Sequence, residues 1–346
     1  MTFSKKMLMF LVLITILVTF TACGTKASEE SPINADTSGA ETQTPSEASG
    51  EETSAADSSE SPINSEWTTG VINDGIELYE VFSFGGGLIG VDSMAVYYSA
   101  DGLNWEMTKN FDPYPVYDAF FAGGQFAVFD ADNTHFTTDG KSWTSAPRQD
   151  NFLFNTAMYD GENFLSVDTA QLCLSTDALK FTTYYRDPMD ARTSIDFRTA
   201  SNEEAPIRRL AIYGGTYYAA GAGIWKATDI NNWTQVVTIE EMVYGAEDLL
   251  YNGSTFFVPA GYEQYAFNGT KITKVSPVGS VFIVDSKNRF LGAYGTGVVN
   301  VSTDGLTWEP LFAEDGVSFR AYTAVEFNGK LFVYGEDGNV RYAEMK

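Results

Sequence analysis

The chain has 346 residues, of which 44% are hydrophobic and 14% aromatic, with 46 acidic against 21 basic side chains. The formal net charge of −25 argues against nucleic acid as a partner, because phosphate binding needs clustered Lys and Arg. One His and two Cys argue against most zinc sites, disulfide frameworks and His-based catalytic triads. The 31 Gly, 19 Tyr and 25 Phe favour many short strands joined by turns.

Residues 1–22 have the pattern of a secretory signal: Lys5 and Lys6, then an apolar run of 14 residues, then small residues before Cys23. A Cys at this place resembles the signal of bacterial lipoproteins. The resemblance implies that Cys23 receives a diacylglyceryl group and becomes the first residue of the mature chain. We therefore expect an extracytoplasmic protein, held on the bacterial cell membrane by its lipid. An ordinary signal peptide with an incidental Cys is the alternative.

Residues 23–65 are predicted to be the lipidated Cys followed by a disordered tether. Residues 24–65 contain no aromatic residue, ten Ser, five Thr and nine acidic side chains. Such a composition buries too little apolar surface to offset chain entropy. A flexible coil of 42 residues spans about 36 Å, enough to hold a domain off a lipid surface.

Residues 66–346 are predicted to be one repeat domain. A pattern of a small residue, any residue, Asp, three further residues and an aromatic ring recurs at 99–105, 137–143, 175–181, 227–233 and 302–308, with decayed copies near Asn268 and Asp337. The spacing is close to 38 residues. A fixed period of about 40 residues suits the four-stranded blades of a β-propeller, so the predicted fold class is all-β.

Each copy of the pattern predicts a tight turn between two strands. The Asp accepts backbone N–H bonds, Gly supplies a positive φ, the Ser or Thr hydroxyl braces the turn, and the aromatic ring packs between blades. These residues resemble the Asp-box repeat of sialidase-like propellers, with one residue fewer between Asp and Trp. The resulting structural residues are Asp101, Trp105, Asp139, Trp143, Asp177, Phe181, Asp229, Trp233, Asp304 and Trp308.

Upstream of each Asp turn lie two apolar strands joined by a short turn. Counting these strand pairs gives seven units, and therefore seven predicted blades. The last unit stops one strand short, at residue 346, and residues 65–69 match the missing strand. We therefore predict that this N-terminal strand completes the last blade and removes an open sheet edge. A six-bladed ring with an irregular unit at 246–290 is the alternative.

The binding surface is expected on the face opposite the Asp turns, where loops join second to third strands and one blade to the next. The longest such loop covers 183–207, and long loops on repeats often carry function. The alternative is that this loop is solvated and that its charged side chains pair with one another. The candidate residues of this face are Tyr114, Asp130, Asp132, Tyr184, Tyr185, Arg186, Arg192, Arg198, Arg208, Tyr262 and Arg320.

Tyr and Arg among carboxylates suit recognition of protein or glycan, so the predicted function is a non-enzymatic binding or scaffolding module. The alternative is a sialidase-type glycosidase, in which Arg148, Arg208 and Arg320 would converge on a carboxylate; no catalytic residue is assigned. No cofactor is expected. Residues 130–134 begin like a calcium loop but lack the later Gly and Glu, so Ca²⁺ is not favoured. His135 is interpreted as a packed ring and Cys173 as a buried thiol.

Overall fold

The computed structural model describes residues 67–72, 76–113, 115–149, 154–168, 170–185, 189, 194–197, 207–238, 241–242, 245–294, 298–312 and 320–345. The propeller lies within the compact unit Glu60–Lys346. Cys23 and the predicted tether lie outside the described residues. Among the described residues, no helix has the length and apolar character needed to cross a membrane.

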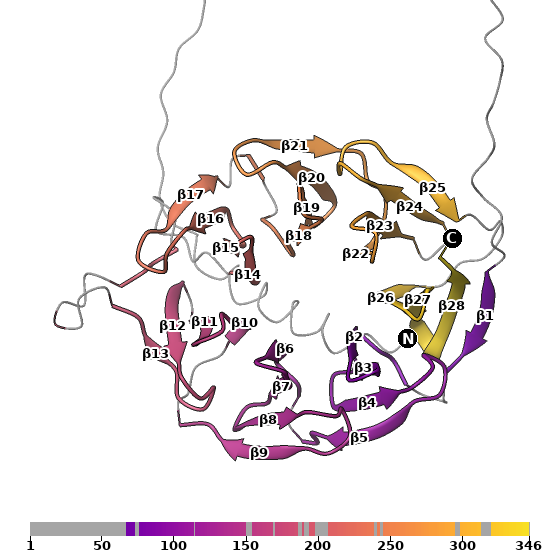
Figure 1. Cartoon of the computed structure of the whole chain (residues 1–346), viewed down its shortest axis with the longest axis horizontal. Coiled ribbons are helices and arrows are strands. Elements are labelled where there is room, and N and C mark those ends of the chain that lie inside the picture. Colours follow the sequence, from indigo (N-terminus) through magenta and orange to yellow (C-terminus); the bar gives the residue numbers. More distant parts are fainter. Residues whose placement is uncertain are drawn as a thin grey trace, which may run out of the picture. The chain divides into compact units, whose positions relative to one another are not determined.

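Within the described residues, twenty-eight strands form seven antiparallel sheets of four, arranged as the blades of a ring (Figure 1). From the inner to the outer strand, the first three blades are β2 (Glu80–Phe84), β3 (Gly87–Val91), β4 (Ala95–Ser99) and β5 (Glu106–Asn110); β6 (Asp118–Ala122), β7 (Gln125–Phe129), β8 (Asn133–Thr137) and β9 (Thr144–Pro147); β10 (Phe154–Tyr159), β11 (Phe164–Asp168), β12 (Gln171–Ser175) and β13 (Thr182–Thr183). We number these blades I to III in chain order.

Blades IV to VI follow the same order, and blade VII takes its outer strand from the start of the domain. Their strands are β14 (Arg209–Tyr213), β15 (Thr216–Ala220), β16 (Ile224–Ala227) and β17 (Thr234–Val237); β18 (Leu250–Tyr251), β19 (Phe256–Ala260), β20 (Glu263–Phe267) and β21 (Ile272–Val275); β22 (Val281–Val284), β23 (Phe290–Ala293), β24 (Val299–Ser302) and β25 (Glu309–Phe312); β26 (Ala321–Phe327), β27 (Lys330–Gly335), β28 (Asn339–Glu344) and β1 (Thr68–Val71). A 3₁₀ turn, η2 (Glu336–Gly338), joins β27 to β28.

The ring closes as the sequence predicts. β1 pairs antiparallel with β28 at four positions, from Thr68 opposite Tyr342 to Val71 opposite Asn339. Beyond the strand, the Ile72 N–H donates to the Gly338 carbonyl at 2.8 Å. The prediction of seven blades is therefore confirmed, and the six-bladed alternative is wrong, because residues 246–290 supply the whole of blade V and the first strand of blade VI.

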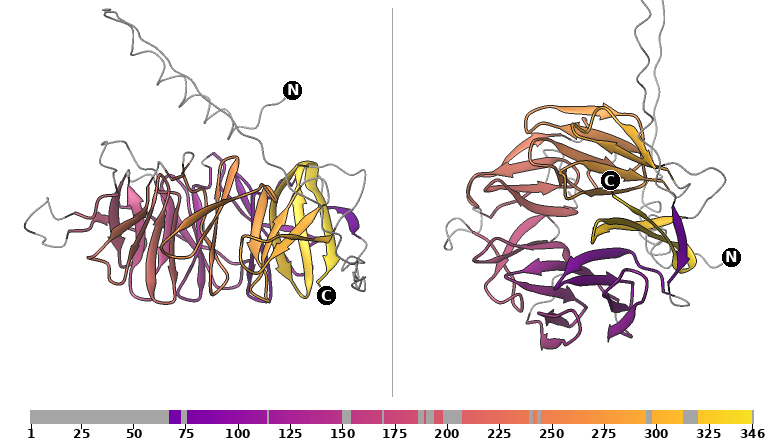
Figure 2. Two further views of the ribbon diagram at one scale, coloured as in Figure 1. Left: turned by 90° about the horizontal axis from the view of Figure 1, so that it is seen from above. Right: turned by 45° about the vertical axis from the view of Figure 1, so that its right-hand side comes forward.

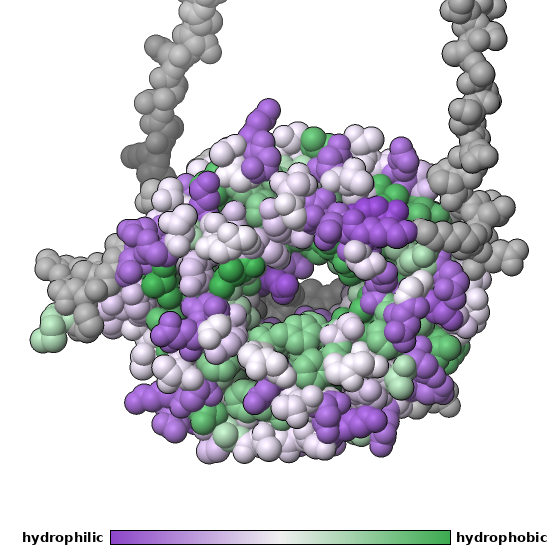
Figure 3. All heavy atoms as spheres, in the orientation of Figure 1, coloured by the Kyte–Doolittle hydropathy of each residue, from purple (hydrophilic) through white to green (hydrophobic). Residues whose placement is uncertain are grey.

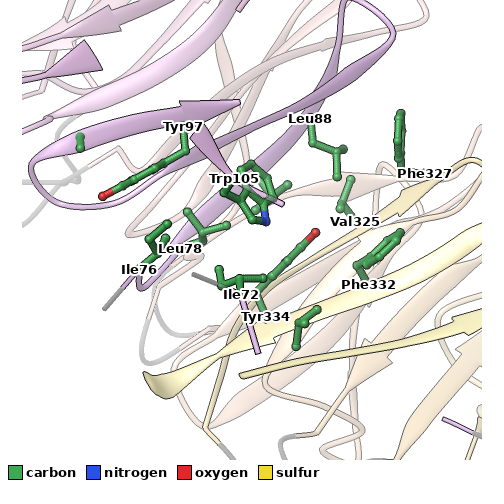
Figure 4. Packing of buried hydrophobic residues seen from close by; sticks show 13 residues of the cluster. Ile72, Ile76, Leu78, Leu88, Tyr97, Trp105, Val325, Phe327, Phe332 and Tyr334 are labelled. Atoms are coloured by element: carbon green, nitrogen blue, oxygen red, sulfur yellow. The ribbon is translucent and has the colours of Figure 1, made fainter. Parts of the chain in front are cut away.

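The hydrophobic core is divided into clusters that fill the space between neighbouring blades. Figure 4 shows the cluster where blade VII meets blade I, in which Trp105 lies next to Tyr334 and Phe332 packs beyond Tyr334. The Trp105 and Tyr334 rings meet edge to face at 5.7 Å. The Tyr334 hydroxyl donates to the Gly102 carbonyl at 2.9 Å, which satisfies a buried polar group at the closure. The first and last blades are thus joined by side chains as well as by β1.

Candidate functional site

The seven blades give the ring two chemically different faces. Because the strands are antiparallel, the turns between strands one and two and between strands three and four lie on one face, which we call the Asp-turn face. The turns between strands two and three and the connections between blades lie on the other, which we call the linker face. The left view of Figure 2 shows the strands running between these two faces.

The Asp turns are built as a structural device. Asp101 Oδ1 accepts the N–H groups of Leu103 at 2.9 Å and Asn104 at 2.8 Å, and Ser99 Oγ accepts the Gly102 N–H at 2.9 Å. Burial alone would raise the pKa of Asp101, but the N–H donors outweigh it and lower that pKa to about 2. The carboxylate is therefore committed to its own turn.

Glycine is required at this turn for two reasons. Gly102 has a φ of 82°, in the left-handed region, and an added Cβ would lie 2.8 Å from the Phe332 ring of blade VII. The turns at Asp139 and Asp304 have the same bonds, with N–H donors at 2.7 and 2.8 Å.

The aromatic side chain that ends each Asp turn packs toward the blade, or the connection, that precedes its own blade in the propeller. Trp105 meets Tyr334 of blade VII, and the Trp143 Nε1–H donates to Thr108 Oγ1 of blade I at 3.2 Å. The remaining partners are Phe129 for Phe181 at 5.9 Å, Phe197 for Trp233 at 5.1 Å and Phe257 for Trp308 at 5.0 Å. These rings hold blades together and do not form an exposed stacking surface for a sugar.

The predicted binding-face residues separate into several groups. Tyr114, Arg186, Arg192 and Arg198 lie outside the described residues. Asp132 and Tyr262 are exposed in turns between second and third strands, Tyr262 with 87% of its surface accessible. Arg208 and Arg320 lie where a connection enters blade IV and blade VII, and Tyr185 pairs in a short bridge with Ser194.

Two predicted binding residues are used inside the fold instead. Tyr184 packs between blades III and IV, and its hydroxyl donates to Asn231 Oδ1 at 2.7 Å. Asp130 is 5% exposed, and its Oδ1 accepts the N–H groups of Asp132 and Asn133 at 2.7 and 2.6 Å. Its other oxygen lies 2.8 Å from His135 Nε2. Neither side chain is presented to a ligand on the linker face.

A charged cluster that the sequence analysis did not identify lies where the inner strands begin. Glu80 and Asp118 are the first residues of β2 and β6, Arg209 is the first residue of β14, and Asp248 precedes β18. Inner strands begin on the linker face, so these four residues, from blades I, II, IV and V, lie at the inner edge of the ring on that face. Arg209 Nε lies 3.2 Å from Asp248 Oδ1. We call this group the channel-mouth cluster.

Asp118 is the unusual member of the channel-mouth cluster. Its Oδ2 atom is sealed from solvent and has no hydrogen-bond partner among the described residues. Burial, reinforced by the nearby Glu80 carboxylate, raises the pKa of Asp118 to about 8. Asp248 raises the pKa of Arg209, so that guanidinium stays charged. The cluster therefore presents a carboxyl group that is neutral near pH 7 beside a fixed ion pair.

The opening itself is visible in Figure 3, where polar and apolar side chains are mixed around it and apolar ones gather over β2 and β6. Among the described residues, no group of three or more His, Cys, Asp or Glu could hold a metal ion. The calcium-like segment at 130–134 has its first carboxylate bound to its own backbone and to His135.

The three arginines of the sialidase hypothesis make separate local contacts. Arg148 stacks over Phe129 and Arg320 over Tyr322, each at 5.5 Å, while Arg208 Nη1 lies 3.5 Å from Glu247 Oε1. Arg148 follows the outer strand of blade II, whereas Arg208 and Arg320 lie at the entries of blades IV and VII, and each is engaged with a neighbour of its own. Nothing in this arrangement clearly favours sialidase chemistry.

The fold and faces define the chain as a seven-bladed all-β propeller. No family model matches the sequence, and no curated protein matches it. Among solved structures, virginiamycin B lyase from Staphylococcus aureus is similar, with 10% identity and a TM-score of 0.62 over 82% of this chain and 100% of that chain. At such identity the likeness shows the fold alone.

Two other solved structures share this fold. YCF48 bound to D1 peptide has 15% identity and a TM-score of 0.56 over 81% of this chain and 97% of that chain. An extracellular domain assigned to a one-component system of B. thetaiotaomicron has 10% identity and a TM-score of 0.59 over 80% of this chain and 40% of that chain. Propellers similar to this one thus include binding components as well as a lyase.

Proposed function

We propose that the protein is a lipid-anchored binding module of the bacterial cell surface, which holds a protein or glycan partner on its linker face without catalysing a reaction there. The observation that carries the proposal is the channel-mouth cluster. A carboxyl group whose pKa is raised by burial and by a neighbouring like charge lacks a compensating cation, and groups of this kind gather at functional sites.

The chemistry of the channel-mouth cluster favours a partner segment with a basic side chain. An ammonium or guanidinium group placed between Glu80 and Asp118 would donate hydrogen bonds and stabilise both carboxylates in their ionised form. Arg209 is already neutralised by Asp248, so the net field at the mouth is negative. A Lys or Arg of a protein segment fits this field, and the peptide complex of the structurally similar YCF48 supports a peptide-like occupant.

The sequence of the first 65 residues supports the proposed lipid anchor. The signal-like residues 1–22 and Cys23 support export and lipidation, and the acidic residues 24–65 support a tether between lipid and propeller. The bonds within the Asp turns support assigning the repeats to the Asp-box type.

The anchor is tested with a Cys23→Ala variant expressed in the native host. We expect the variant to leave the membrane fraction and to appear in the medium, because a signal without a lipidated Cys leaves no hydrophobic attachment. Retention of the variant in washed membranes would contradict lipidation at Cys23.

The binding face is tested by charge reversal on the two faces. The full chain, Glu80→Lys and Glu162→Lys are each cross-linked in native envelopes, and the cross-linked partners are identified by mass spectrometry. Glu162 is an exposed residue of the turn between the first two strands of blade III, so its reversal makes the same change in charge on the Asp-turn face. We expect a partner whose cross-link to the linker face is lost with Glu80→Lys and kept with Glu162→Lys, because a basic partner segment needs the negative charge of the channel mouth. Equal loss with both variants would contradict the assignment of the face.

A further inference from the structure

The outer half of blade II contains a hydrogen-bonded relay of three side chains. His135, on β8, has its Nε2 2.8 Å from Asp130 Oδ2 and its Nδ1 2.7 Å from Ser145 Oγ. Lys109 Nζ of blade I lies 3.2 Å from the same Ser145 Oγ. His135 and Asp130 are buried, at 3% and 5% exposure, while Ser145 is exposed. The relay thus runs from a buried carboxylate to a hydroxyl at the surface.

The strand register explains why the hydroxyl and the ring meet. His135 lies opposite Ser145 in the β8–β9 pair. In the same register the Arg148 N–H donates to the Asp132 carbonyl at 2.7 Å, so Asp132 and Arg148 form a hydrogen-bonded pair. Hydrogen-bonded and non-hydrogen-bonded pairs alternate along an antiparallel ladder, so His135 and Ser145, three positions away, form a non-hydrogen-bonded pair. Side chains approach most closely at such pairs. The Ser145 N–H consequently points away from β8, and β9 is the outer strand of the blade.

Blade I has a different pair of residues at the equivalent positions. There Asp92 accepts the N–H groups of Met94 and Ala95 at 2.6 and 2.7 Å, and the Tyr97 hydroxyl donates to its second oxygen at 2.9 Å. Tyr97 lies opposite Met107. In blade I, therefore, a Tyr bonds the half-buried Asp92.

Blade II replaces both members of that strand pair at once. His135 stands where blade I has Tyr97, and Ser145 stands where it has Met107. The bracing of the turn does not require this exchange, because Tyr97 achieves the same bond to its Asp. Compared with Tyr97 and Met107, blade II has an additional ring nitrogen that does not contact the Asp, and a hydroxyl that is hydrogen-bonded to this nitrogen.

The protonation states follow from the surroundings. Burial alone would raise the pKa of Asp130, but the bonds from His135 and two backbone N–H groups outweigh it and lower that pKa. An ionised Asp130 only accepts, so the His135 Nε2 carries the proton. Burial lowers the pKa of His135, with Lys109 adding to the effect against Asp130. The neutral ring therefore offers its Nδ1 lone pair to the Ser145 hydroxyl.

We propose that Ser145 is an activated nucleophile, with His135 as its general base and Asp130 as the positioning residue, and that it accepts acyl groups from ester substrates. The proposal stands apart from the binding function, because the relay lies on the outer strands and not at the channel mouth. The single His of the chain argues against a catalytic triad on composition, but the proposal needs only one His, which has both partners within hydrogen-bond distance.

The reaction balances with groups that are present. Ser145 Oγ attacks the ester carbonyl carbon and passes its proton to His135 Nδ1, and the negative oxygen that forms lies within reach of the outward Ser145 N–H and of Lys109 Nζ. His135 returns the proton to the leaving alcohol as the C–O bond breaks. Water then attacks the acyl-serine with His135 again taking a proton, which releases the acid and restores Ser145.

The proposal is tested by labelling the full chain with a fluorophosphonate probe, which bonds to an activated serine with loss of fluoride. We expect peptide mapping to place the label on Ser145, and we expect Ser145→Ala to abolish it. Ser83→Ala, which removes another exposed strand serine, is expected to leave labelling unchanged. Absence of labelling, or a label on another serine, would overturn the proposal.

A second variant separates the general base from mere structure. His135→Tyr copies Tyr97 of blade I, so it preserves the bond to Asp130 and the fold, as checked by the melting temperature. We expect its labelling rate to fall by about 100-fold or more, the usual contribution of a general base. Asp130→Asn should lower the plateau rate and move the inflection of the pH–rate curve to lower pH, because the negative charge that raises the His135 pKa is gone. An unchanged rate in His135→Tyr would refute the base role.

Discussion

Replacement of Asp118 by Asn tests the electrostatics of the channel mouth most directly. In the unfolded chain this carboxyl ionises near its ordinary pKa of 3.8, whereas in the folded protein burial beside Glu80 raises its pKa to about 8. Because the folded pKa is the higher one, the stability that this group contributes is fully present below pH 3.8 and is lost as the pH rises to about 8. Asn has the same shape and no ionisation, so it removes this dependence.

The size of the effect follows from the span between the two pKa values. Keeping the carboxyl protonated at pH 7 costs about 1.4 kcal/mol for each pH unit above the unfolded pKa, or about 4 kcal/mol for a fully sealed group. Asp118 keeps part of its surface accessible, and water reduces this figure, so we expect about 2 kcal/mol. For a domain of this size that corresponds to a melting temperature higher by about 4–8 °C in Asp118→Asn.

The assay is urea unfolding of the wild-type and Asp118→Asn chains at pH 4, 6 and 8. We expect the two chains to differ little at pH 4 and the variant to gain stability steadily toward pH 8. Asp132→Asn, which removes one exposed carboxylate from the same face, controls for the change in net charge. A stability difference that stays constant between pH 4 and pH 8 would refute the inference that Asp118 is protonated in the folded protein.

Two further predictions concern the closure of the ring. Deletion of residues 66–72 removes β1 and the buried Ile72, so we expect a loss of several kcal/mol, and an unchanged melting temperature would contradict closure through this strand. Gly102→Ala should cost about 2–4 kcal/mol, since it combines a left-handed φ with a Cβ 2.8 Å from Phe332. Gly124→Ala is the matched control: its φ is 85° but nothing lies within 4 Å of the added Cβ, so chemical denaturation should show a loss of only about 1–2 kcal/mol.

Much of the fold could be predicted because its signals are local. An Asp followed by Gly, with Ser or Thr before and Trp after, specifies a turn through bonds among neighbours, as at residues 99–105. Five copies of this pattern and two decayed ones, at a spacing close to 38 residues, leave few alternatives to a propeller. The closing strand could also be predicted, because residues 65–69 repeat the outer strand of the other blades.

The channel-mouth cluster could not be predicted, because its members are neighbours only through the closed ring. Asp118 and Arg209 are 91 positions apart, and neither belongs to a motif. The available signal was a charged residue at the first position of an otherwise apolar inner strand, as in Glu80 before Val81. Tyr184 shows the opposite error, since an aromatic residue beside a long loop suggested a ligand surface and the structure uses it to bind Asn231 between blades.

Repetition makes each departure from the pattern informative. Blades I and II bond an Asp of the turn between second and third strands with different residues, Tyr97 and His135. His135 meets the task of Tyr97, yet it also carries a second ring nitrogen, and its cross-strand partner is Ser145 where blade I has Met107. Two coordinated changes in one strand pair are harder to attribute to drift than either alone. Comparison of the blades with one another therefore locates candidate chemistry in a chain that no family model describes.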